Sequence, residues 1–167
     1  MLLPETIELG KLSGPPVREH ESLVALRAMW ESKKSPKGLP SKSDFPPGEL
    51  KPWLGHIALV DVDSVATRFR MRLMGVDLVH YAGTDYTGRW LDECFTGEKL
   101  EKIQKPYLHC IASKTPSYDC ALQKVSVTRR TVLHRLHLPC AGDGETVDTI
   151  LGCAYAVEEP GDFRNAV

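Results

Sequence analysis

The sequence predicts an α+β fold in which a sheet carries small helices on its apolar face. Residues 68–73 alternate strictly between arginine and apolar side chains, which is typical of a strand with one buried and one wet face. After Gly75 the apolar spacing becomes nearly helical, and it ends at Gly83, a residue suited to a helix stop. A Thr-Gly turn follows at residues 87–88. A half-buried strand, a short helix and a turn in close succession indicate helices folded over a sheet.

The first half of the chain predicts a flexible arm, an amphipathic helix and two strands. Residues 1–18 show little periodicity and form the arm. From Glu19 to about Lys33 an apolar stripe recurs at three- and four-residue spacing, which predicts a helix. Residues 57–62 predict a strand that forms an antiparallel hairpin with the alternating strand. The side chains expected to face the helices are Phe69, Met71 and Leu73.

The second half predicts one long helix and three more strands. Residues 96–113 have one apolar face, although Pro106 should kink or interrupt that helix. Gly142-Asp143-Gly144 is a strong turn signal before the last strand. The strands are expected at about residues 117–128, 131–138 and 149–157. We take residues 19–157 as a single domain and residues 158–167 as a C-terminal tail.

The composition fits one globular domain in the cytoplasm. The 167 residues are 42% hydrophobic and 26% charged, with a formal net charge of −1 that gives no global attraction to nucleic acid or anionic membrane. No apolar run approaches the roughly 20 residues that span a bilayer, and residues 1–5 lack the pattern of a signal peptide. The five cysteines include no Cys-x-x-Cys pair, so we expect reduced thiols.

The order of elements and several short motifs resemble the PAS family, and more narrowly the stand-alone PAS-type proteins common in alphaproteobacteria. The matching stretches are residues 39–45, 54–62, 68–89 (including Arg72-Leu73-Met74-Gly75 and Thr87-Gly88-Arg89), 136–139, Asp143-Gly144 and Leu151-Gly152. Lys42 stands where arginine is expected, which keeps the charge but loses the planar fork. The resemblance implies a five-stranded antiparallel sheet with short helices on its concave face, and a sensory or protein-interaction module.

The resemblance also implies a space between the sheet and the helices, which in PAS domains often holds a small ligand or cofactor. A filled core is the alternative, because well-packed interiors leave few voids. The sequence requires no cofactor, and the identity of any ligand stays open. The candidates for the wall of an open pocket are Phe69, Met71, Tyr81, Trp90, Cys94, Tyr107 and Cys153.

Metal and catalytic chemistry are weakly indicated. Haem-binding PAS domains use a histidine from the long helix, so His109 is the candidate axial ligand for a haem sensor. His134 and His137 are three apart on a predicted strand and therefore on opposite faces, which disfavours a shared zinc ion. No nucleophile, base and orienting group form a convincing set, and we expect no enzymatic activity.

A basic sheet face is the second candidate site. Arg68, Arg70 and Arg72 project together, and further basic residues lie on strands expected to border them: Lys124, Arg129, Arg130 and Arg135. The face is either solvated, which discourages edge aggregation, or docks an acidic protein or, less favourably, RNA. Near-zero net charge and the lack of interleaved aromatic residues disfavour nucleic acid.

The predicted N-terminal helix gives two alternatives for assembly. Its stripe either covers the protein's own sheet or pairs with a second copy in a homodimer, and we favour the homodimer. The stripe consists of Leu23, Leu26, Met29 and Trp30. We therefore expect a non-catalytic sensory or regulatory module that binds a small ligand or a partner protein. Because the chain ends soon after the fifth strand, its output would pass through a separate signalling or regulatory protein.

Overall fold

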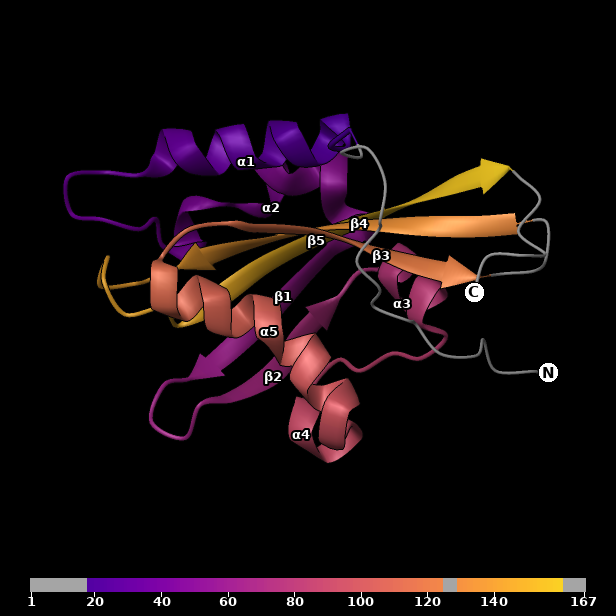
Figure 1. Cartoon of the computed structure of the whole chain (residues 1–167). Coiled ribbons are helices and arrows are strands. Elements are labelled where there is room, and N and C mark those ends of the chain that lie inside the picture. The colour runs from indigo at the N-terminus through magenta and orange to yellow at the C-terminus, as the bar shows by residue number, and fades with distance from the viewer. Residues whose placement is uncertain (1–17, 125–128, 161–167) are drawn as a thin grey trace.

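The computed structural model describes residues 18–124 and 129–160, in the predicted order of elements (Figure 1). The predicted arm, apart from Arg18, and residues 161–167 of the predicted tail lie outside the described residues. The helices are α1 (Glu21–Lys33), α2 (Pro47–Leu50), α3 (Val76–Ala82), α4 (Leu91–Cys94) and α5 (Gly97–Ser113), with 3-10 turns at Lys42–Asp44 and Lys51–His56. The strands are β1 (Ile57–Asp63), β2 (Arg68–Met74), β3 (Ser117–Lys124), β4 (Arg129–Cys140) and β5 (Thr149–Pro160).

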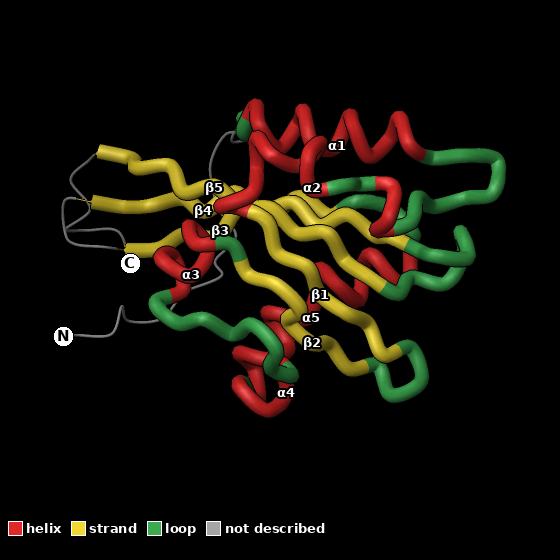
Figure 2. The backbone as a smooth tube through the Cα atoms, turned by 180° about the vertical axis from the view of Figure 1, so that it is seen from behind, coloured by secondary structure: helices red, strands yellow, loops and turns green. Residues whose placement is uncertain are grey.

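The five strands form one antiparallel sheet in the order β2-β1-β5-β4-β3. This confirms the predicted α+β fold class. In Figure 1, α5 crosses in front of the sheet, and in Figure 2, seen from behind, β1 and β2 lie in front of α5. We call the face toward α5 the inner face and the opposite face the outer face. β5 continues through Pro160 in pairing with β4, so the predicted tail begins inside the sheet.

The helix α1 packs against the protein's own sheet. Leu23, Leu26 and Trp30 are completely buried, and Trp30 Nε1 donates a hydrogen bond of 2.9 Å to the carbonyl oxygen of Pro139 on β4. Met29 is partly buried against the same core. The apolar stripe is therefore covered within one chain and is not free to pair with a second copy. A homodimer would need a different surface.

A β-bulge in β2 alters the predicted set of inward side chains. Phe69 and Met71 are buried, as the alternation predicts. Leu59 pairs with Leu73 but Val60 pairs with Met71, which leaves Arg72 as an extra residue. An extra residue reverses the alternation of faces. The prediction that Leu73 faces the helices is therefore wrong: its side chain is 42% exposed.

The two longer helices after β2 frame the inner face. α3 ends at Gly83, which has a φ of 72° and donates its N–H to the Val79 carbonyl, so the predicted stop is confirmed. α5 runs on through Pro106 without the predicted interruption. None of the five cysteines, all of which lie in the described residues, forms a disulfide. Within residues 18–124 and 129–160, no helix is long and apolar enough to cross a bilayer.

Candidate functional site: a cavity beneath α3 and α5

A cavity of about 150 Å³ lies between the inner face of the sheet and helices α3 and α5. Four strands and two helices contribute to its wall, so segments far apart in sequence meet there. Most of its lining is apolar, with a short polar stretch on β4. The lining residues are Ala58, Val60, Met71, Met74, Leu78, Tyr81, Ala82, Tyr107, Leu133, Arg135, His137, Gly152, Cys153 and Ala154.

The helical side of the cavity consists of one face of α3 and a single aromatic side chain from α5. Tyr81 and Ala82 lie three and four residues after Leu78, so all three share the side of α3 toward the cavity. The Tyr107 ring meets the His137 ring edge to face, with 5.3 Å between the ring centroids. Burial raises the pKa of Tyr107 to about 12, so its phenol group is neutral at physiological pH.

Small residues on the neighbouring strands β1 and β5 form the floor of the cavity. Ala58 on β1 pairs with Gly152 on β5, and Gly152 pairs in turn with His137 on β4. A Cβ atom added at Gly152 would meet the Ala58 Cβ at 3.6 Å and the His137 Cδ2 at 3.8 Å. Both distances are ordinary contacts, so this glycine is not required by crowding. Glycine inside a strand weakens it and often marks a place where a ligand approaches the backbone closely.

The polar end of the cavity is formed by Arg135 and His137 on β4. Arg135 donates two hydrogen bonds, of 2.7 Å and 2.6 Å, to the carboxylate of Asp119 on β3, so its charge is balanced. His137 is 7% exposed, and its Nδ1 atom has no hydrogen-bond partner among the described residues. Burial, assisted by the nearby Arg135 charge, lowers the pKa of His137 to about 3. The imidazole is therefore neutral, and one of its polar atoms is unsatisfied.

Four of the seven residues expected in a pocket wall line this cavity, and three do not. Met71, Tyr81, Tyr107 and Cys153 line it. Phe69 is buried and packs against Tyr107, with 5.2 Å between the ring centroids. Cys94 belongs to α4 and is outside the lining.

Trp90 lies away from the cavity because it is held at the β2 edge. The backbone next to Trp90 extends that edge: Met71 N donates to Arg89 O, and Arg70 forms a β-bridge with Trp90. The guanidinium carbon of Arg68 lies 4.3 Å from the centroid of the Trp90 ring, a cation–π contact. Trp90 therefore covers arginine side chains instead of lining a pocket.

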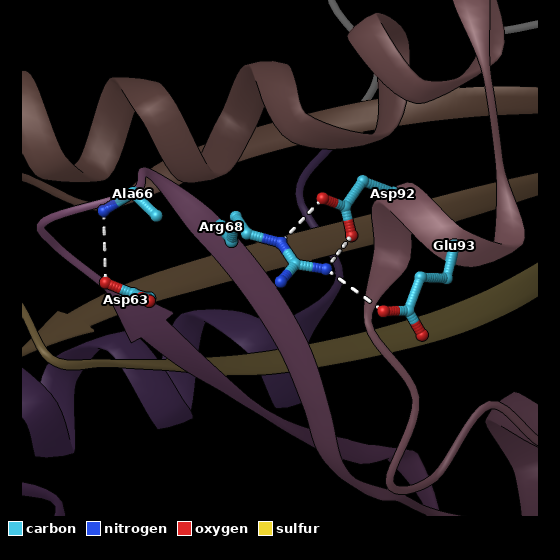
Figure 3. A network of polar contacts seen from close by, with 5 residues as sticks. All are labelled: Asp63, Ala66, Arg68, Asp92 and Glu93. Atoms are coloured by element: carbon cyan, nitrogen blue, oxygen red, sulfur yellow. Dashed lines mark hydrogen bonds and ion pairs between the residues drawn. The ribbon is translucent and has the colours of Figure 1, made fainter.

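The arginines of β2 are engaged within the chain. Arg68 donates to Asp92 through Nε at 2.7 Å and Nη2 at 2.9 Å, and to Glu93 at 3.1 Å (Figure 3). This guanidinium keeps the pKa of the Asp92 carboxyl below its ordinary value. Arg70 and Arg72 form ion pairs with Asp61 on β1. Much of the positive charge that the sequence predicts on this face is therefore paired with aspartate and glutamate side chains of β1 and α4.

The expectation that Arg135 borders the β2 arginines is wrong. The sheet order places β1 and β5 between β2 and β4, and Arg135 lies on the inner face. Arg70 pairs with Asp61, which belongs to the opposite face from Val60 and Met71. The side chains of Lys124, Arg129 and Arg130 lie outside the described residues.

The histidines considered as metal ligands lie apart. His109 is exposed on α5, with Nε2 3.4 Å from the hydroxyl of Thr115, and does not line the cavity. His134 and His137 occupy opposite faces of β4, as predicted: the His134 Nδ1 atom lies 2.7 Å from the Tyr118 hydroxyl on the outer side. Within the described ranges, no group of three or more His, Cys, Asp or Glu side chains is placed to hold a metal ion.

The sequence reasoning missed several residues that line the cavity, and some of them had a readable signal. The adjacent apolar pair Leu73-Met74 interrupts the strict alternation and could have indicated the bulge that turns Met74 inward. Gly152 and Ala154 are two small residues at alternate positions of β5, a sign of space beside one face of the sheet. His137 carries no such signal in the sequence, because histidine is intermediate in its preference for burial.

Comparison with known proteins agrees with this architecture. A family model described as a PAS domain matches residues 18–155. The chain belongs to the PAS domain family. The solved light-state structure of the blue-light photoreceptor Aureochrome1 LOV is similar at 12% sequence identity and a TM-score of 0.44, covering 66% of this chain and 87% of that one. Among curated proteins, none matches. PAS domains are generally sensory or signalling modules.

Proposed function

We propose that this PAS domain is a non-catalytic sensory or regulatory module that binds a small molecule in the cavity beneath α3 and α5. The motifs quoted above favour membership of the stand-alone PAS-type proteins within the family.

The observation that carries this proposal is an open cavity of about 150 Å³ on the inner face of the sheet. Protein interiors are close-packed, and few voids exceed the size of a water molecule. Small-molecule sites are mostly apolar with a few polar groups, and the lining of this cavity has that composition. Both features support a site that a small molecule fills.

A titration followed by NMR tests the proposal. Single-ring probe compounds are added at millimolar concentration to ¹⁵N-labelled protein. We expect amide shift changes to concentrate in α3, near Tyr107 and along residues 133–137. Gly152→Val, which projects a larger side chain into the cavity, should abolish them, whereas Gly48→Val, in α2 with open space around its Cβ position, should not. Shift changes scattered over the surface, or unaffected by Gly152→Val, would contradict the proposal.

The two alternatives from the sequence gain less support. An adaptor that docks an acidic partner needs available guanidinium groups, and Arg68, Arg70, Arg72 and Arg135 all have acidic partners within the chain. A haem sensor based on His109 needs that side chain beside the cavity, and it lies on the exposed side of α5.

A further inference from the structure

The wall of the cavity contains a tyrosine hydroxyl that has no partner among the described residues. Tyr107 lines the cavity and is 7% exposed, and its ring packs against Phe69 and His137. In the described part of the chain, the fully enclosed side-chain atoms without a partner are Asp61 Oδ1 and His137 Nδ1, so the Tyr107 hydroxyl keeps some accessible surface. Since the rest of Tyr107 is buried, this surface belongs to the cavity.

Arg135 adds further unused donors near this hydroxyl. Of the five N–H groups of a guanidinium, two donate to Asp119, which leaves three without an acceptor among the described residues. The Arg135 side chain is 17% exposed. Burial raises the pKa of Tyr107 to about 12, while the Arg135 charge opposes that rise and the Asp119 charge adds to it, so the phenol lies within reach of both charges. The polar end of the cavity therefore presents donors.

These donors call for an oxygen acceptor on the ligand. The Tyr107 phenol is neutral at physiological pH, so its O–H group is available to donate. A carbonyl oxygen has two lone pairs and accepts from two donors. An amine or ammonium group would bring more N–H donors to a place that already has an excess of them. A carbonyl-type oxygen is the complementary group.

The charge balance favours a neutral ligand. Among the described residues that line the cavity, Arg135 carries the one formal charge, and Asp119 already balances it. A ligand carboxylate would lose its hydration and would also approach the Asp119 carboxylate. A neutral carbonyl group has a much smaller cost of burial.

The remainder of the lining requires an apolar body. Val60, Met71 and Met74 project from β1 and β2, and Leu78 projects from α3. Methionine side chains are flexible and adapt to differently shaped apolar partners. Because the cavity is open to solvent, part of a ligand can extend out of it. The lining therefore defines the chemistry of the buried portion and leaves the length of the ligand free.

We propose that the cavity binds a neutral ligand with an apolar body and a carbonyl-type oxygen, and that this oxygen accepts a hydrogen bond from the Tyr107 hydroxyl. The inference rests on the proposed function, since it names the ligand class for the same cavity. Acetophenone is a simple probe of this class. Ethylbenzene has the same carbon skeleton without the oxygen, and benzoate carries a charged oxygen in place of the methyl group.

NMR titrations of these three probes against wild type and Tyr107→Phe test the ligand class. Tyr107→Phe keeps the ring and removes the hydroxyl, so it should weaken acetophenone binding about fivefold and change ethylbenzene binding by no more than about twofold. Benzoate should bind wild-type protein at least about tenfold more weakly than acetophenone. Tyr86→Phe is the matched control: Tyr86 packs on Phe95 outside the lining, and this variant should leave both affinities unchanged.

The outcomes separate the ligand class from the proposed function. If benzoate binds as tightly as acetophenone, or if Tyr107→Phe weakens acetophenone no more than ethylbenzene, the ligand class is overturned while the cavity remains a binding site. If none of the three probes shifts the amides around the cavity, the proposed function fails as well.

Should Tyr107→Phe not fold, two observations on wild-type protein decide. The carbonyl ¹³C resonance of bound, labelled acetophenone should lie downfield of its position in cyclohexane, because a hydrogen bond polarises the carbonyl group. A nuclear Overhauser effect should join the acetophenone methyl group to the Tyr107 ring. The absence of either signal overturns the inference.

Discussion

His137 is a buried side chain whose pKa is lowered to about 3, and its neighbours explain why. It faces the cavity, the Tyr107 ring and the Arg135–Asp119 pair, and none of these offers Nδ1 a hydrogen bond. The residue keeps a neutral ring in a place where a charged one would be costly. Its contribution to stability therefore depends on pH.

Acid should destabilise the protein partly through His137. Its pKa is about 3 in the folded state against an ordinary value of 6.5, so between those pH values the unfolded chain binds more protons. The free energy of unfolding therefore falls as pH falls through this window, by up to about 5 kcal/mol from this residue. Urea denaturation at pH 7, 5 and 4 should show a weaker pH dependence for His137→Phe than for wild type. His109→Phe is the control, and equal pH dependence in all three proteins would contradict the assignment.

At the scale of elements, the bulge in β2 decides which side chains stabilise the core. Phe69 is 1% exposed and packs on Tyr107, while Leu73, four residues later, is on the solvent side. We expect Phe69→Ala to lower the free energy of unfolding by about 3–5 kcal/mol. Leu73→Ala should change it by about 0.5 kcal/mol or less. Urea denaturation measures both, and similar costs at the two positions would mean that the strand keeps its alternation without a bulge.

The helix α1 offers a second matched pair of residues. Leu26 is completely buried on the sheet, whereas Val24 is 39% exposed. Leu26→Ala should cost about 2–5 kcal/mol of unfolding free energy, and Val24→Ala about 0.5 kcal/mol or less. Chemical denaturation combined with light scattering gives stability and oligomeric state together. A Leu26→Ala variant of unchanged stability that loses a dimer would show that the stripe serves a second copy after all.

The sequence predicted where the helices and strands lie better than which face of the sheet each side chain occupies. Particular residues show why. Alternation around Phe69 placed β2 because one of its faces is charged. Along β4 both faces are buried: His134 and Leu136 lie on one side, and Arg135 and His137 on the other. When both faces are buried, the hydrophobic pattern says little about which face of the strand a side chain occupies. Strand order placed Arg135 beside a cavity, and strand order depends on long-range pairing that periodicity does not reveal.

The cavity itself belongs to the whole molecule, since its volume depends on small side chains from several strands and on the position of α3. That helix has no fully buried residue, and Leu78, Tyr81 and Ala82 face the cavity. It therefore has fewer packing contacts than α1 and should open more readily. An occupant would supply the contacts that this face of α3 lacks.

Ligand binding should accordingly order α3 more than any other helix. With a single-ring probe compound at saturating concentration, we expect hydrogen exchange of the α3 amides to slow, and α1 amides to change less. Mass spectrometry of exchanged peptides measures this, with Gly152→Val as the variant that should show no effect. Slower exchange in α1 without slower exchange in α3 would contradict the expectation that a ligand in the cavity orders α3.

A crystal structure of the protein grown with a single-ring probe compound tests binding in the cavity directly. We expect density for one ring beneath α3 and α5, beside Met71, Tyr81 and Tyr107. Density for the ring only outside this cavity would contradict the proposed function.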